Sequence, residues 1–179
     1  TSVSEFHKQD LKIIDLGNLV GDLQLSERHE AGKTAAKEVI EKGARWIGLG
    51  GGHDYGYPDG AGFLLANKNS QQKPLIINFD AHLDVRPTDK GLSSGTPFYR
   101  LLTEEGLPEF DFYEVGIQRQ CNSQEHIHWA QEKNDNIIFY EDMMMSGATP
   151  LQYLTNYFSE ILVKPRPTFI SIDIDCFST

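Results

Sequence analysis

The feature of this 179-residue chain that most constrains its fold is a regular alternation of short apolar runs with longer amphipathic stretches. The apolar runs cover residues 11–17, 45–50, 74–80, 112–117, 136–140 and 168–175. Each run is almost continuously hydrophobic, as in "PLIINFD" (74–80), and does not alternate with polar residues. This pattern is typical of strands covered on both faces, which is the environment of a parallel sheet.

The stretches between the runs have the composition and spacing of helices. The clearest covers residues 26–43, and we expect it to begin at a Ser26 cap and to end at Gly43. Further helices are expected over 59–68, 96–105, 123–133 and 150–163. Strand and helix therefore alternate, which predicts an α/β fold with right-handed crossovers. Since no linker or repeat interrupts the pattern, residues 1–179 are expected to form a single domain.

Composition argues against several classes of protein. The hydrophobic fraction of 39% is enough for a core, and the net charge of −10 argues against a nucleic-acid-binding surface. No apolar run approaches the roughly 18 residues of a membrane span, and the N-terminus lacks the pattern of a signal peptide. Cys121 and Cys176 form no disulfide framework. We therefore expect a cytoplasmic protein that binds neither nucleic acid nor membrane.

Polar clusters follow three of the predicted strands. His53 follows the run at 45–50, the segment Asp80-Ala81-His82-Leu83-Asp84 closes the run at 74–80, and Asp173-Ile174-Asp175 closes the last run. Ligands of parallel α/β sheets bind beyond the carboxyl ends of the strands, so all three clusters are expected at one edge. The candidate catalytic and metal-binding residues are His53, Asp80, His82, Asp84, Asp173 and Asp175.

This set of side chains suits divalent metal ions. Residues at i, i+2 and i+4 of an extended chain face the same way, about 6.5–7 Å apart, which would place Asp80, His82 and Asp84 on one side. Four carboxylates packed together repel one another unless cations neutralise them. Carboxylates combined with imidazoles favour Mn²⁺-type ions over thiolate-rich zinc sites, and two such ions would acidify a water molecule for hydrolysis.

Simpler interpretations remain open for each cluster taken alone. A single Asp at a strand end is commonly a cap or a turn residue, and a single His is commonly a surface or core group. "GLGGGH" (48–53) also resembles a phosphate-binding loop, but His53 stands where the third glycine of that motif belongs. Three clusters at corresponding strand ends favour the metal site.

Together these motifs resemble the ureohydrolase family, which includes arginase, agmatinase, guanidinobutyrase and formimidoylglutamase. The matching segments are Gly51-Gly52-His53, Asp80-Ala81-His82-Leu83-Asp84 and Ser171-Ile172-Asp173-Ile174-Asp175, and the resemblance covers about residues 45–177. It implies a three-layer α/β/α domain with a mainly parallel sheet, the arginase-deacetylase-like fold. It also implies two manganese ions and a homo-oligomer when the chain is full length.

The resemblance further implies how the ligands divide between the two ions. One ion would be held by His53 and Asp84, the other by His82 and Asp175. The bridging carboxylates would be Asp80 and Asp173.

Three further residues bear on the substrate. Ser94 stands where arginases and agmatinases carry a histidine, and the segment Ser-Gly-Thr-Pro-Phe (94–98) resembles the formimidoylglutamase branch. Arg86 could grip a substrate carboxylate bidentately, or form a surface salt bridge. Asn122 could contact substrate polar groups or serve as a helix N-cap.

The resulting expectation is a hydrolase that converts N-formimino-L-glutamate, a small-molecule substrate of histidine catabolism, into glutamate and formamide. The alternatives are an arginase-, agmatinase- or guanidinobutyrase-type guanidino hydrolase, a deacetylase-like enzyme with one metal ion, and a non-catalytic metal-binding paralogue. The family extends well beyond its third motif, whereas here the motif is followed only by residues 176–179. We therefore expect a domain truncated at its C-terminus.

Overall fold

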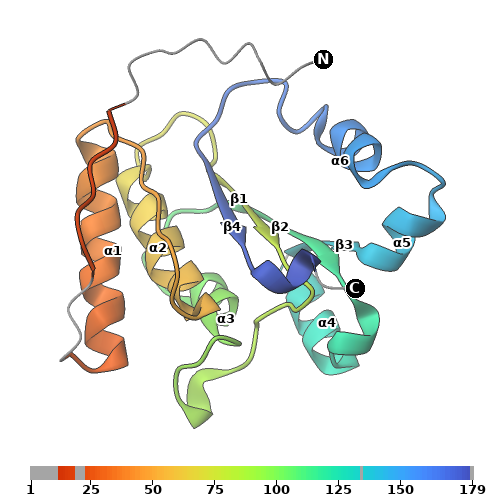
Figure 1. Cartoon of the computed structure of the whole chain (residues 1–179), viewed down its shortest axis with the longest axis horizontal. Helices are drawn as coiled ribbons and strands as arrows, with labels where there is room; N and C mark the ends of the chain where they lie inside the picture. The colour runs from red at the N-terminus through yellow and green to blue at the C-terminus, as the bar shows by residue number, and fades with distance from the viewer. Residues whose placement is uncertain (1–11, 19–22, 134, 178–179) are drawn as a thin grey trace.

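The computed structural model describes residues 12–18, 23–133 and 135–177, and its centre is a parallel sheet (Figure 1). The strands are β1 (Leu75–Phe79), β2 (Asp111–Ile117), β3 (Asp135–Phe139) and β4 (Thr168–Ile172). Their order is β3-β2-β1-β4, and every neighbouring pair is parallel. Because β1 lies inside the sheet, its apolar residues are buried on both faces, as its continuous hydrophobicity predicts.

Helices cover both faces of the sheet. They are α1 (Leu25–Glu41), α2 (Gly56–Ala66), α3 (Pro97–Thr103), α4 (Gln124–Glu132), α5 (Tyr140–Met145) and α6 (Pro150–Phe158). One hydrophobic core joins α2, α3 and α4 to Ile76 and Phe112, and α1 packs against α2. A second core joins Phe158 of α6 to Leu75 and Ile77 on the opposite face. The expected α/β/α layering is therefore present (Figure 1).

Two predicted strands are wrong. Residues 12–17 and 45–49 form no strand, while residue 11 lies outside the described residues. Ile47 and Leu49 of the second segment are exposed. A segment becomes a β-strand only when its backbone is hydrogen-bonded to a neighbouring strand. In the described sheet β4 pairs with β1 alone, so neither of the two runs pairs with its outer side. A hydrophobic run without such a partner stays irregular.

The predicted helices exist, with different ends. The N-cap of α1 is Gln24, whose backbone N–H donates to Glu27 at 2.9 Å, so the predicted Ser26 cap is wrong. Gly43 follows this helix with φ +79°, as a C-terminal glycine should. The last helix, α6, is shorter than predicted, and α5 was not anticipated because its first residue, Tyr140, was assigned to a strand. In the described part of the chain, no helix has both the length and the hydrophobicity needed to span a membrane.

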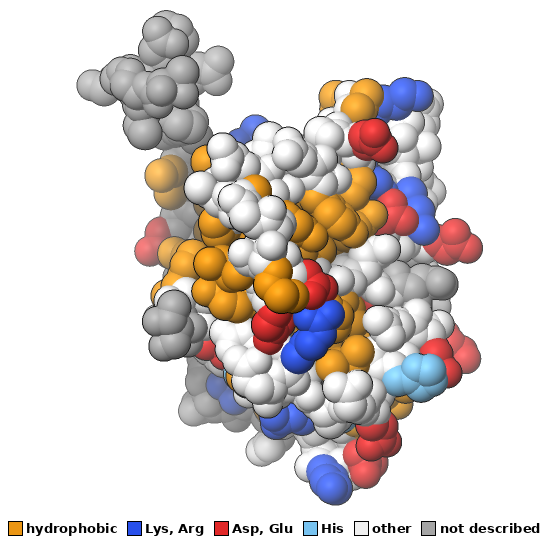
Figure 2. Space-filling model, turned by 90° about the vertical axis from the view of Figure 1, so that its right-hand side faces the viewer, with side chains coloured by type: hydrophobic (Ala, Val, Ile, Leu, Met, Phe, Trp, Pro, Cys, Tyr) orange, Lys and Arg blue, Asp and Glu red, His pale blue; other side chains and the backbone are white. Residues whose placement is uncertain are grey.

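The side of the molecule that carries α5 and α6 exposes several hydrophobic side chains beside acidic and basic groups (Figure 2). The exposed residues of these two helices include Met144, Met145, Leu151 and Tyr157. A cluster of this kind is a candidate contact surface.

A pair of carboxyl groups is buried within the sheet. Asn78 of β1 stands opposite Glu114 of β2 and donates to it at 2.8 Å. The second oxygen of Glu114 and both carboxyl oxygens of Asp135 have no hydrogen-bond partner among the described residues. Burial, reinforced by the charge of Asp135, raises the pKa of Glu114 well above its usual value. The folded chain therefore keeps a proton here that the unfolded chain releases.

This proton predicts that the metal-free chain becomes less stable as the pH rises. A raised pKa in the folded state contributes stability that is present below the unfolded value of about 4.5 and is lost as the pH climbs. Glu114→Gln cannot ionise, so between pH 5 and pH 8 it should lose less stability than the unchanged chain, by on the order of 2 kcal/mol. Urea unfolding in EDTA measures this difference. The exposed Glu105→Gln variant is the control, and the same pH slope in both variants would contradict the prediction.

Candidate metal centre

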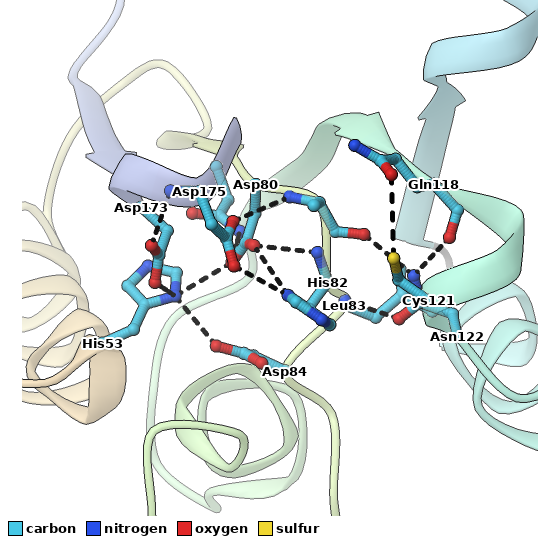
Figure 3. A network of polar contacts seen from close by, with 12 residues as sticks. His53, Asp80, His82, Leu83, Asp84, Gln118, Cys121, Asn122, Asp173 and Asp175 are labelled. Atoms are coloured by element: carbon cyan, nitrogen blue, oxygen red, sulfur yellow. Dashed lines mark hydrogen bonds and ion pairs between the residues drawn. The ribbon is translucent and has the colours of Figure 1, made fainter. Parts of the chain in front are cut away.

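The register of the sheet brings the second and third sequence clusters together. Phe79 of β1 pairs with Ile172 of β4, and these are the last residues of their strands. Asp80 and Asp173 follow them directly, and the Asp173 N–H donates to the Phe79 carbonyl at 2.9 Å. Both aspartates therefore start at the same level of the sheet edge, as the strand-end rule predicts (Figure 3).

A first group of ligand atoms gathers around the ring of His53. Its Nδ1 lies 2.9 Å from Asp80 Oδ2, 2.9 Å from Asp84 Oδ2 and 3.4 Å from Asp173 Oδ2. Its Nε2 lies 2.9 Å from the buried hydroxyl of Ser171. Ser171 therefore holds the ring through Nε2. The other ring nitrogen, Nδ1, faces the carboxylates of Asp80, Asp84 and Asp173 (Figure 3).

A second group forms beside the first. His82 Nδ1 lies 2.9 Å from Asp175 Oδ2 and 3.7 Å from Asp80 Oδ1. The carboxylate of Asp80 is therefore shared, with Oδ2 toward His53 and Oδ1 toward His82. Within each group, one ligand atom from every residue lies within 4.8 Å of the others. Asp173 belongs by this measure to the first group.

The side chains converge by a different route from the one predicted. The strand ends at Phe79, so Asp80, His82 and Asp84 are not consecutive positions on one extended face. The His82 N–H donates to Asp80 Oδ1 at 2.8 Å, which turns the chain. Asp84 then has φ +49°, the single positive value for a non-glycine residue in the described segments. Such a conformation is disfavoured for Asp, and it turns the carboxylate toward His53.

The third cluster also leaves the strand. β4 ends at Ile172, and Asp175 lies in the short 3-10 helix Ile174–Phe177. The Asp175 N–H donates to Asp173 Oδ1 at 3.1 Å, and Asp175 Oδ1 accepts from the Ala81 N–H at 3.3 Å. The predicted strand to residue 175 is therefore wrong at its end, and the turn directs the two carboxylates to different groups.

Electrostatics favours a cation at this site. Burial lowers the pKa of His53, but hydrogen bonds and charges from Asp80 and Asp84 outweigh this and raise it to about 10. Burial also raises the pKa of Asp84, although its contact with His53 opposes the change. The metal-free chain thus uses a proton to offset the repulsion between carboxylates. Carboxylate oxygens combined with imidazole nitrogens fit Mn²⁺ as the group that would replace this proton.

The residues predicted to contact substrate lie around this centre. Arg86 is exposed, and its guanidinium passes so close to Gly95 that a Cβ there would be 3.0 Å from Nε. Ser94 is also exposed and lies beside Gly52, next to His53.

Asn122 is used in holding the metal-site loop. Its Oδ1 accepts from the Leu83 N–H at 2.9 Å, and its Nδ2 donates to the carbonyls of Ala81 and Gln118 at 3.0 and 2.8 Å (Figure 3). The alternative that Asn122 is a helix N-cap is wrong, because Ser123 is the N-cap of α4. Contact with substrate stays a prediction.

A groove of about 1030 Å³ opens beside the first group. Its lining includes Leu49 and His53, together with Ile170, Ile172 and Asp173. These isoleucines belong to β4, whose outer side has no partner strand in the described sheet. His53 and Asp173 of the first ligand group therefore line this groove.

Two residues of this region were missed from the sequence. Ser171 belongs to the third motif, and its position two residues before Asp173 was the available signal for a role beside the ligands. His29 has no candidate partner within its own segment, so the sequence predicts a solvated side chain. This prediction is wrong, because His29 is fully buried. Its partner, Asp54, lies 25 positions away, so no local sequence pattern could indicate the contact.

Comparisons with known proteins agree with this geometry. A sequence model of the arginase family matches residues 1–179. Formimidoylglutamase from Salmonella newport is 32% identical over 172 residues, which cover 94% of this chain and 51% of that protein. The chain thus spans about half the length of the curated relatives it matches.

Solved structures of formimidoylglutamases and of an arginase are also similar to this chain. A Trypanosoma cruzi formiminoglutamase variant with Mn²⁺ has a TM-score of 0.76 at 30% identity, and covers 92% of this chain and 53% of its own. Formimidoylglutamase from Bacillus subtilis has a TM-score of 0.73 at 27% identity, covering 90% and 50%. Arginase from Bacillus caldovelox, at 19% identity and a TM-score of 0.64, covers 92% and 58% and shares the fold.

Proposed function

The chain belongs to the arginase family, and from this premise we propose that it forms the two-manganese centre of a hydrolase that cleaves a C–N bond in a linear amidine. The observation that carries the proposal is the shared carboxylate of Asp80, whose two oxygens face separate groups of ligand atoms. A carboxylate placed in this way is suited to join two cations. His53 and Asp84 would complete one site, and His82 and Asp175 the other.

Asp173 is proposed as the second bridge. It starts at the same sheet level as Asp80, and its Oδ2 lies 3.4 Å from His53 Nδ1. Its Oδ1 accepts from the N–H of Asp175, so its position is tied to the residue that serves the other site. When bound, the two ions would supply Lewis-acid polarisation of the amidine and lower the pKa of a water molecule.

The substrate that we propose is N-formimino-L-glutamate, giving glutamate and formamide. Support comes from relatives that are formimidoylglutamases at 32% and 30% identity, whereas the arginase likeness concerns the fold alone. Ser94 cannot act as a histidine-like base, which suits a branch that does without that histidine. The exposed guanidinium of Arg86 is available for a substrate carboxylate, since no described carboxylate forms a salt bridge with it.

We also propose the activity, the cellular location and the oligomeric state of the full-length protein. Because the chain spans half the length of its relatives, turnover is proposed for the full-length protein. A cytoplasmic homo-oligomer remains the expectation for it. The hydrophobic side chains exposed on α5 and α6 support a subunit contact there (Figure 2).

The test is a side-by-side assay of the full-length protein loaded with Mn²⁺. Formiminoglutamate, arginine and agmatine are offered separately, and formamide and urea are measured. We expect formamide from formiminoglutamate and little urea from the other two. Urea from arginine without turnover of formiminoglutamate would refute the substrate. No turnover of any of the three, with manganese bound, would favour the non-catalytic alternative.

Arg86 gives a prediction for substrate recognition. Arg86→Gln in the full-length enzyme removes a charge-assisted, bidentate contact with a carboxylate, so KM for formiminoglutamate should rise about 10- to 100-fold. The turnover number should change much less, because the contact is distant from the reacting bond. Steady-state kinetics separates the two. Lys68→Gln removes an exposed cation two residues after the end of α2 and is the matched control. Equal KM values in both variants would refute the role of Arg86.

A further inference from the structure

A buried imidazole lies directly behind the turn that carries His53. His29 belongs to α1 and has no exposed surface. Its Nε2 lies 2.6 Å from Asp54 Oδ2, and its Nδ1 lies 2.7 Å from Nη1 of Arg100 in α3. Asp54 follows His53 in the chain, within the short helix His53–Tyr55. Two helices therefore meet at the residue beside a proposed metal ligand.

The hydrogen-bond roles in this cluster are determined by its chemistry. The guanidinium of Arg100 can only donate, so Nδ1 of His29 must accept. Nε2 then carries the ring hydrogen and donates it to the carboxylate of Asp54. The order Arg100, His29, Asp54 is thus a directed chain of hydrogen bonds. It holds the imidazole in one tautomer and one orientation.

Aromatic contacts hold the same cluster in place. The ring of His29 lies edge-on to Tyr55, with 5.3 Å between centroids. The guanidinium of Arg100 stacks on Tyr57, 3.3 Å from the ring centroid. On the other side of the turn, Phe98 packs edge-on against His53 at 5.4 Å. The cluster therefore lies in a packed interior, where an unpartnered polar group would be costly.

The backbone before His53 consists of three consecutive glycines. Gly50 and Gly51 have φ values of +80° and +82°, a region that side chains disfavour. A Cβ on Gly52 would lie 2.5 Å from Asp54 Oδ1, so the turn needs glycine to bring Asp54 close to its own backbone. Three consecutive glycines lose more conformational entropy on ordering than other residues do. An anchor immediately after His53 offsets that loss.

We propose that His29 is a positioning residue for the metal centre. Together with Arg100 it holds Asp54, and through the backbone of Asp54 it determines where the imidazole of His53 stands. His29 touches none of the proposed ligands, so its effect should be confined to the site that His53 serves. This inference rests on the proposed function, because it assigns His53 to one of two cation sites.

The test uses three substitutions at position 29 in the full chain. His29→Gln keeps a donor near the Nε2 position and an acceptor for Arg100. His29→Asn is too short to reach Asp54, and His29→Phe keeps the ring while removing both hydrogen bonds. Calorimetric titration with Mn²⁺ should show 10- to 100-fold weaker binding of one ion in the Asn and Phe variants. The second ion should bind as before, and Gln should recover most of the loss.

A matched control separates positioning from general destabilisation. Phe158→Leu perturbs the core on the opposite face of the sheet, far from this turn. It should lower the urea midpoint without changing either manganese affinity. Unchanged binding in His29→Asn and His29→Phe would overturn the proposal, as would equal weakening of both ions. If His29→Phe does not fold, the comparison of Asn with Gln gives the answer.

A second measurement tests the positioning role of His29 in the metal-free protein. A crystal structure of His29→Asn in EDTA should show the His53 ring displaced from Asp80 and Asp84. A ring that stays within 3 Å of both carboxylates, about the range of a direct hydrogen bond, would refute the positioning role. If the unchanged protein binds no manganese, the proposed function fails, yet this structure still decides whether His29 positions His53.

Discussion

Replacing Asp80 with Asn is expected to remove both manganese ions, with each affinity falling at least about 100-fold. The two oxygens of Asp80 face different ligand groups, so one substitution weakens both sites at once. An amide offers one weak oxygen ligand in place of a charged carboxylate with two. Calorimetric titration counts the ions, and the electron paramagnetic resonance spectrum of Mn²⁺ reports whether two of them lie close together.

The neighbouring ligands give the comparison that makes this result specific. Asp84→Asn should weaken one ion and Asp175→Asn the other, since each belongs to a single group. Asp89→Asn, in an exposed position, should change neither. Retention of one ion at full affinity in Asp80→Asn would refute the bridging role. The metal-free variant should stay folded, because removing one of four crowded carboxylates relieves repulsion.

Manganese affinity at the His53 site is expected to rise about tenfold for each pH unit between pH 6.5 and 8.5. Without metal, contacts with Asp80 and Asp84 overcome the effect of burial and raise the pKa of His53 to about 10. A metal ion needs the neutral imidazole, so binding must release this proton throughout that range. The proton is held by the metal-free form, and higher pH therefore favours the bound form.

Proton release can be measured directly. Titrations in buffers of different ionisation enthalpy should show about one proton released when the His53 site fills. His53→Gln cannot hold this proton, so its weaker binding should lose most of the pH dependence. A manganese affinity that is independent of pH in the unchanged chain would contradict the arrangement of His53 between two carboxylates.

Much of the architecture could be predicted from local pattern. The runs at 74–80, 112–117 and 136–140 and the start of the last run correspond to β1 to β4, because strands buried in a parallel sheet must be apolar on both faces. The runs at 11–17 and 45–50 have the same pattern, yet their described residues form no strand. Hydrophobicity shows that a segment can be a strand, whereas pairing depends on what lies beside it.

The candidate site, like the fold, could be predicted from the sequence only in part. The identities of the proposed ligands and their place at one sheet edge followed from three motifs at predicted strand ends, of which those at Asp80 and Asp173 do follow strands. The positive φ of Asp84 and the turn at Asp173–Asp175 did not, because an extended chain was assumed where the strands had already ended. The role of Asn122 in holding the loop could not be predicted either, because its backbone partners Leu83 and Ala81 lie 39 and 41 positions away.

By itself, the sequence determined the fold class and predicted the proposed metal ligands, since both depend on local composition and spacing. The tertiary structure decided which oxygen of Asp80 faces which imidazole, and that Ser171 meets His53 across 118 positions. It also turned His29 from a predicted surface residue into the buried partner of Asp54. These contacts join residues far apart in the chain, and only packing brings such residues together.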